Sequence, residues 1–234
     1  MRHRPSLIVG SYNVHKGIGA DGRRDPGRVA SVIRELGADL VALQEVDRRF
    51  GDRRGVFDLQ ALAEETGLTP ALPDSRKGAL AHGWHGNLIL TRGAEVTDLR
   101  TLDLPGFEPR GALVADLFFA GVNLRVIATH LGLLKTSRRA QAQRLLAEVA
   151  GDRPTLVMGD LNEWRAGPGC SLARLKGAAP APPASFPARR PFLPLDRILA
   201  LNHAEVDEVI AHASPLARLA SDHLPLRARV RLMP

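Results

Sequence analysis

Short apolar runs of strand length dominate the sequence and constrain its fold more than any other feature. They fall at residues 6–15, 38–46, 87–91, 95–102, 113–119, 124–129, 155–159, 195–201, 206–210 and 224–232. Gly121-Val122-Asn123 separates two of these runs, which predicts a hairpin. Helical spacing is confined to a few segments, so we expect sheets packed face to face with helices outside, an α/β (α+β) fold. Because no linker or internal repeat divides the chain, we expect residues 1–234 to form a single domain.

Three segments have the apolar spacing of amphipathic helices, at residues 26–36, 59–66 and 136–149. In the third, one face carries Leu145, Leu146 and Val149. We therefore expect the arginines of this helix to face solvent, namely Arg138, Arg139 and Arg144. The segment 167–190 is rich in Pro, Ala and Gly and is interpreted as a long loop, a kind of segment that is often functional.

Bulk properties exclude some classes of protein. No segment reaches the roughly 18 to 20 apolar residues of a membrane span, so we expect no stable membrane insertion and a cytoplasmic location. A single cysteine rules out an intramolecular disulfide. The net charge of +7 favours polyanions such as nucleic acid, although heavy Arg usage is also typical of a GC-rich genome. Aromatic residues make up only 4%, which gives little support to a base-stacking platform.

Polar side chains interrupt the apolar runs at their ends. These residues are Asn13, Glu45, His130, Asp160, Asn162, Asp196, Asp222 and His223. Each of them alone is readily explained as a satisfied core group or a solvated rim residue. Burial of so many polar groups costs free energy unless they pair with one another or with a ligand, so the set predicts a functional site.

The residue types in this set restrict the chemistry. Carboxylate and amide oxygens suit Mg²⁺ or Mn²⁺, and the spacing typical of zinc ligands is absent. The sequence has no phosphate-binding loop ending in Gly-Lys-Ser/Thr and no Gly-x-Ser-x-Gly elbow. A metal ion combined with His and Asp groups favours hydrolysis of a phosphate ester.

The motifs "SYNVH", "LQEV", "GNLILTR", "THLGL", "GDLNEW", "LDRIL" and "SDHLPL" occur in this order between residues 11 and 226. On these motifs the sequence resembles the endonuclease/exonuclease/phosphatase superfamily of metal-dependent phosphohydrolases, and "EPRGAL" is most similar to its small bacterial members. The resemblance implies a four-layer α/β/β/α sandwich of two mixed β-sheets. It also implies a phosphoric ester hydrolase that depends on Mg²⁺ or Mn²⁺.

The resemblance further implies roles for the polar set. Glu45 would be the principal metal ligand, with Asn13 and Asp222 completing or supporting the site. Asp160 would orient or deprotonate the attacking water, and Asn162 would hold a phosphate oxygen. The resemblance also implies roles for two histidines and one aspartate. His223 would face the scissile phosphate and be oriented by Asp196, while His130 would stabilise the transition state or assist the leaving group. Either Asp160 or the His223–Asp196 pair would be the base.

One position departs from the pattern of the pancreatic-type deoxyribonucleases. Where those enzymes place an acidic partner for the histidine of "THLGL", this sequence has His85, so His130 is expected to lack an acidic orienter. His85 and Asn87 remain candidate phosphate contacts, and Arg110 is a candidate phosphate-binding arginine, because a guanidinium donates hydrogen bonds to phosphate.

Three functions remain open from the sequence. The first is a phosphodiesterase that hydrolyses nucleic acid, in an endo- or exonuclease-like manner. The second is a phosphoesterase acting on lipid headgroups or phosphorylated small molecules, for which Pro191-Phe192-Leu193-Pro194 would supply an apolar surface. The third is a non-catalytic binding module, which the complete set of polar residues disfavours. No protein partner is predicted.

Overall fold

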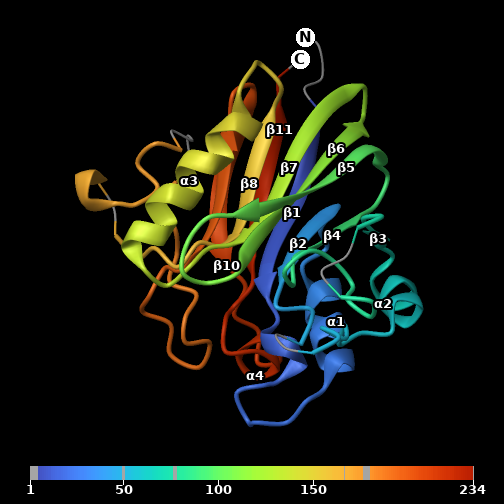
Figure 1. The fold of residues 1–234 in the computed structure, drawn as a ribbon. Coiled ribbons are helices and arrows are strands. Elements are labelled where there is room, and N and C mark those ends of the chain that lie inside the picture. The colour runs from blue at the N-terminus through green and yellow to red at the C-terminus, as the bar shows by residue number, and fades with distance from the viewer. Residues whose placement is uncertain (1–4, 49–50, 76–77, 166, 176–179, 234) are drawn as a thin grey trace.

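The strands form two sheets, as Figure 1 shows for the computed structural model. The structure describes residues 5–48, 51–75, 78–165, 167–175 and 180–233. One sheet has the order β10-β11-β1-β2-β4-β3 and the other the order β5-β6-β7-β8-β9. Both sheets are mixed, because β1–β2 and β7–β8 are parallel pairs and their remaining neighbours are antiparallel.

The strands of the first sheet are β1 (Ser6–Asn13), β2 (Leu40–Gln44), β3 (Thr69–Ala71), β4 (Leu88–Thr91), β10 (Ala204–Ala211) and β11 (Leu226–Leu232). Those of the second are β5 (Glu95–Leu104), β6 (Arg110–Phe119), β7 (Val122–His130), β8 (Thr155–Asp160) and β9 (Asp196–Leu201). The helices are α1 (Pro26–Glu35), α2 (Leu59–Thr66), α3 (Lys135–Val149) and α4 (Ala217–Ala220), with short 3₁₀ turns η1 (His15–Gly17) and η2 (Gly167–Gly169).

Strand alternation builds the layers. In β2, Leu40 and Ala42 belong to the core between the two sheets, whereas Val41 and Leu43 pack with α1 and α2 on the outer face. In the second sheet Val157 packs outward with Leu145 of α3. The result is the expected four-layer sandwich of helices, sheet, sheet and helix, with α3 covering the sheet opposite to that of α1 and α2 (Figure 1). The β6–β7 hairpin at Gly121 is confirmed.

The helices follow local sequence rules, with one exception. Asp25 caps α1 by accepting a hydrogen bond from the Arg28 backbone N–H, and Pro26 takes its first position. The expectation that Arg138 faces solvent was wrong, because its side chain is buried and contacts Ser171, Glu163 and the carbonyls of residues 132 and 133. This arginine anchors the loop after β8 to α3, a role that periodicity alone does not reveal. No helix in the described part of the chain is long and apolar enough to cross a membrane.

The strand registers bring the polar ends together at one edge of the sandwich. Asn13 lies opposite Gln44, one residue before Glu45. His130 lies opposite Asp160, and Asp160 lies opposite Asp196, which starts the antiparallel strand β9. Polar residues that are far apart in the sequence therefore converge because their strands begin or end at the same level.

Gly159 is required immediately before this edge. Its φ of 151° lies in a region that favours glycine, and a Cβ there would overlap the Thr129 carbonyl oxygen of the neighbouring strand. We expect Gly159→Ala to lower the free energy of unfolding by about 2–4 kcal/mol, measured by urea denaturation. Gly121→Ala is the matched control, since Gly121 also has a positive φ (86°) but a Cβ added there would meet nothing within 4 Å. Equal losses in the two variants would contradict the steric explanation.

Candidate active site

Asn13 links the two sheets at the centre of the site. Its amide Nδ2 lies 3.0 Å from Asp160 Oδ2 and 3.5 Å from Glu45 Oε1, and its Oδ1 accepts a hydrogen bond from the His15 backbone N–H at 3.0 Å. Glu45 directly follows β2 of the first sheet, and Asp160 ends β8 of the second. One amide therefore holds both carboxylates within the separation that a metal ion and a bridging water span.

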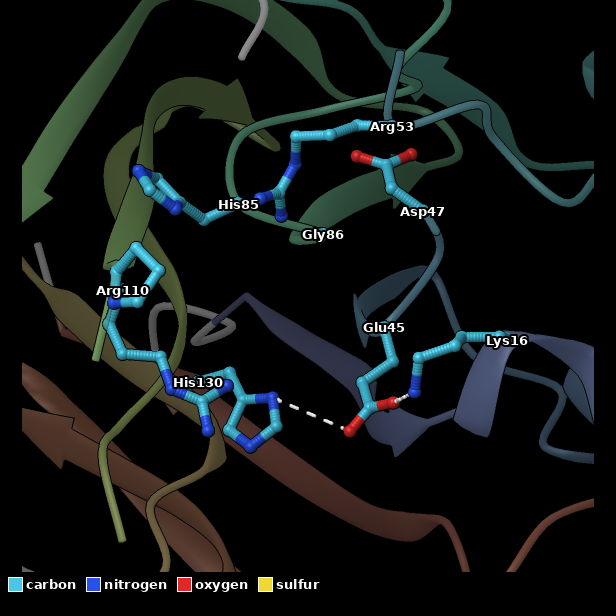
Figure 2. A pocket seen from close by; sticks show the side chains of 9 residues that line it. Lys16, Glu45, Asp47, Arg53, His85, Gly86, Arg110 and His130 are labelled. Atoms are coloured by element: carbon cyan, nitrogen blue, oxygen red, sulfur yellow. Dashed lines mark hydrogen bonds and ion pairs between the residues drawn. The ribbon is translucent and has the colours of Figure 1, made fainter. Parts of the chain in front are cut away.

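Glu45 is an ionised carboxylate at a strained position. Its φ of 58° is uncommon for a residue with a side chain, and it pairs with the Lys16 ammonium (Figure 2). Burial acts to raise the pKa of Glu45, but the His130 ring and the Lys16 ammonium outweigh burial and hold this pKa at about 2. The backbone of Lys16 is itself left-handed, with a φ of 58°, and its N–H donates to the Glu45 carbonyl.

His130 lies between the carboxylates of both sheets. Its Nε2 is 3.3 Å from Asp160 Oδ2, and its Nδ1 is 4.0 Å from Glu45 Oε1. Two carboxylates thus lie near this histidine, and neither comes from the segment before "GNLILTR", where the acidic orienter was expected to be missing. Burial, followed by the positive charge of Arg110, lowers the pKa of His130 well below its ordinary value despite the attraction of Glu45. The ring is accordingly neutral at pH 7.

The "GDLNEW" segment forms the floor of the site. Asp160 Oδ1 accepts a hydrogen bond from the Asn162 backbone N–H at 3.0 Å, and Asn162 Nδ2 donates to the Leu131 carbonyl at 2.9 Å. Asn162 adopts a positive φ of 51°, which turns the chain directly after the strand. Burial and then the charge of Asp196 raise the pKa of Asp160. The two carboxylates joined by Asn13 thus differ in acidity because their surroundings differ.

His223 and Asp196 form a buried pair, as expected. His223 Nδ1 lies 2.8 Å from Asp196 Oδ2, which also accepts a hydrogen bond from Ser185 Oγ at 2.6 Å. The other ring nitrogen, Nε2, points toward Asp160 Oδ2 at 3.7 Å, and the Phe186 ring packs against the imidazole with its centroid 4.9 Å away. Burial opposes the charged ring, but Asp196 and Asp160 outweigh it and raise the pKa of His223.

The three remaining expected residues lie in different places: one at the rim of the site, one in the wall of a cavity and one in the core. Asp222 is half-exposed at the rim, with its Oδ1 3.7 Å from His15 Nδ1. Arg110 lines a cavity together with Glu45 and His130. Asn87 is fully buried, and its Nδ2 donates to the carbonyls of Trp84 (2.9 Å) and Gly111 (3.1 Å). The structure thus does not bring Asn87 into the cavity with Arg110.

Sequence reasoning missed several residues that line this cavity. They are Lys16, Asp47, Arg53, Gly86 and Pro109, whereas His85, which also lines it, was expected as a candidate phosphate contact. Lys16 follows "SYNVH", so nearness to a motif was the available signal. Asp47 is buried and accepts a hydrogen bond from the His82 backbone N–H at 2.8 Å, which fixes the loop before β4.

The donor set fits a cation of the Mg²⁺ or Mn²⁺ type. Glu45 is ionised and lines the cavity, and Asn13 ends β1. Asp222 is close to Asn13, because the hydroxyl of the preceding Ser221 donates to the Asn13 carbonyl at 2.7 Å. Among the residues that the structure describes, no three His, Cys, Asp or Glu side chains converge as a ligand cluster. Mg²⁺ usually keeps several waters and is held by one or two carboxylates, so a site centred on Glu45 meets its requirements. The Lys16 ammonium lies where it balances the charge of this carboxylate.

The His223–Asp196 pair makes stability depend on pH. Because the folded-state pKa of His223 is raised, its stabilising contribution is complete below about pH 6.5 and is lost as the pH rises through the raised pKa. Asp196→Asn removes the main partner charge, so we expect the free energy of unfolding near neutral pH to fall by about 1–3 kcal/mol.

Urea denaturation between about pH 6 and pH 10 measures this effect. The wild-type protein should lose more stability than Asp196→Asn as the pH rises over this range. Asp207→Asn, which removes an acidic partner of Arg231 at the surface, is the control and should follow the wild type. Parallel pH profiles for the wild type and Asp196→Asn would contradict the assignment.

Comparisons with known proteins agree with this geometry. A family model described as the Endonuclease/Exonuclease/phosphatase family matches residues 10–223. The uncharacterized protein YbhP of Escherichia coli K12 is 31% identical over 253 residues, which cover 97% of this chain and 97% of the relative.

Two solved structures share the fold at low sequence identity. The human Nocturnin catalytic domain with bound sulfate has a TM-score of 0.71 at 19% identity, covering 100% of this chain and 97% of that chain. A mannosyl-6-phosphatase of Bacteroides thetaiotaomicron has a TM-score of 0.69 at 15% identity, covering 96% of this chain and 99% of that chain. On the extent of the family match and of the relative, this chain belongs to the endonuclease/exonuclease/phosphatase family.

Proposed function

We propose that the protein is a divalent-metal-dependent phosphodiesterase that hydrolyses nucleic acid. Members of its family are phosphoric ester hydrolases and are generally dependent on divalent metals. The observation that carries the proposal is the pair of carboxylates joined by Asn13, one ionised and one of raised pKa, between two histidines. Two carboxylates with separated acidities suit a site that binds a cation with one and moves a proton with the other.

Each residue has a role in this proposal. Glu45 is the principal ligand for Mg²⁺ or Mn²⁺, supported by Asn13 and Asp222. Such a cation, when bound there, would neutralise charge on the phosphate oxygens. Asn162 holds an oxygen of the scissile phosphate, and Arg110 binds a phosphate group of the substrate from the cavity wall. His130, neutral and buried beside both carboxylates, serves the leaving group or the transition state.

The raised pKa values favour Asp160 over His223 as the base. His223 is held as an imidazolium by Asp196 and Asp160, and an imidazolium has no lone pair with which to accept a proton. A carboxylate whose pKa is raised toward neutrality is better matched to taking a proton from water at pH 7. The protonated His223, with Nε2 near Asp160, is then placed to bind the scissile phosphate.

We propose nucleic acid as the substrate because the protein is basic. The chain carries a net charge of +7, and the cavity beside Glu45 is lined by Arg53, Arg110 and Lys16. A basic surface attracts the polyanionic backbone and raises the rate of association at low salt.

An activity panel tests the proposal directly. Plasmid DNA, abasic duplex, single-stranded DNA and RNA are incubated with purified protein and Mg²⁺ or Mn²⁺. We expect cleavage that EDTA abolishes and that Glu45→Gln and Asp160→Asn reduce by about 100-fold or more, because each removes a group that acts on the reacting atoms. His212→Ala, which removes a histidine paired with Glu35, is the control and should retain activity. Absence of cleavage with either metal on every substrate would overturn the nucleic-acid assignment.

Exposed apolar side chains favour a second candidate, hydrolysis of a lipid phosphodiester. Phe107, Leu133 and Phe192 are 87%, 64% and 68% exposed, and Phe192 lies in the Pro-rich segment that sequence analysis singled out for a lipid surface. Phe107 and Leu133 lie on neighbouring loops, because Glu108 accepts a hydrogen bond from the Leu133 backbone N–H at 2.7 Å. Release of headgroup from sphingomyelin or phosphoinositide vesicles, with nucleic acid left intact, would favour this candidate over the first.

A further inference from the structure

The cavity beside Glu45 has two chemically different walls. It has a volume of about 60 Å³ and opens between the sheets. In Figure 2, Glu45 and Lys16 stand on one side, and His85, Arg110 and His130 stand on the other. The first wall is therefore the cation-binding side of the proposed reaction, whereas the second presents the rings of His85 and His130 and the guanidinium of Arg110. Asp47 and Arg53 also line the cavity.

His85 is fixed in this second wall. Its Nε2 lies 2.8 Å from Asp103 Oδ1 on β5, and its side chain is only 3% exposed. The Trp84 and His85 rings are nearly perpendicular, with their centroids 5.4 Å apart. Its φ of 50° is uncommon for a residue with a side chain. Asp103 is 63% exposed and lies behind the imidazole, away from the cavity that the ring lines.

Arg110 is held in a similar way. Its Nη2 donates to Glu108 Oε2 at 2.8 Å, and Glu108 is fixed in turn by the Leu133 backbone N–H. The Nε of Arg110 is buried and has no hydrogen-bond acceptor among the described residues. A buried N–H without an acceptor is costly, and an oxygen ligand in the cavity would satisfy it.

The two carboxylates that hold His85 and Arg110 belong to the same hairpin. Asp103 stands near the end of β5 and Glu108 in the connection to β6, so the β5–β6 hairpin fixes the side chains of His85 and Arg110 together. The groups placed around the scissile phosphate on the other side, Asp160, Asn162 and His223, do not line this cavity. The cavity thus lies beside the reaction centre, on the far side of Glu45 and His130.

We propose that His85 and Arg110 form a second phosphate subsite, which binds the phosphate next to the scissile one on the nucleotide chain. The inference rests on the proposed function, because it takes Glu45 and His130 as the neighbours of the scissile phosphate. An imidazole and a guanidinium, each held from behind by a carboxylate, match the several oxygens of one phosphate.

Dinucleotides with and without an end phosphate test the subsite. The substrates are TpT, pTpT and TpTp, so that the extra phosphate is offered at each end in turn. We expect one of the two phosphorylated forms to have a KM at least about tenfold below that of TpT, as befits a charge-assisted contact. The same ratio should appear in dissociation constants measured by calorimetry in EDTA, where nothing is turned over.

The gain from the end phosphate is then measured in variants. We expect His85→Ala and Arg110→Ala each to remove most of it, and Asp103→Asn to reduce it by loosening His85. His212→Ala removes another His–carboxylate pair, far along the chain on the α1 side, and should leave the gain unchanged.

The outcomes separate the subsite from the activity. Cleavage of TpT without any gain from an end phosphate, or a gain that survives both alanine variants, overturns the subsite. If no dinucleotide is cleaved but the end phosphate still tightens binding through His85 and Arg110, the subsite stands and the nucleic-acid activity fails.

Discussion

The site depends on one amide that donates to carboxylates from two sheets. Asn13 ends β1 and contacts Glu45 and Asp160, two carboxylates that would otherwise repel one another at this edge of the sandwich. Parallel pairing of β1 with β2 and of β7 with β8 puts these residues at the same level. The four-layer architecture is thus also what concentrates acidic and basic groups at one edge.

The two carboxylates differ in acidity because their surroundings differ. Glu45 faces Lys16 and His130 and stays ionised, while Asp160 is buried beside Asp196 and resists ionisation. Left-handed backbone at Lys16, Glu45, His85 and Asn162 turns the chain sharply just beyond the strands. Strain of this kind persists only where packing enforces it, and here the two packed sheets do so.

The sequence predicted the strands, the layers and most of the polar set, because alternation and strand ends are local patterns. It could not predict contacts that depend on which strands become neighbours. His130 lies near Asp160, which is opposite it on the neighbouring strand. The Arg138 side chain turns inward and anchors a loop, and the Asn87 amide donates to two backbone carbonyls. The positions of His85 and Arg110 likewise depend on the β5–β6 hairpin, because its residues Asp103 and Glu108 contact them.

Anomalous diffraction from crystals grown with Mn²⁺ tests the central claim most directly, because it locates the cation without reference to any substrate. The account predicts an anomalous peak at coordinating distance from Glu45, with the Lys16 ammonium displaced from that carboxylate. A cation bound elsewhere, with Lys16 still paired to Glu45, would contradict the account.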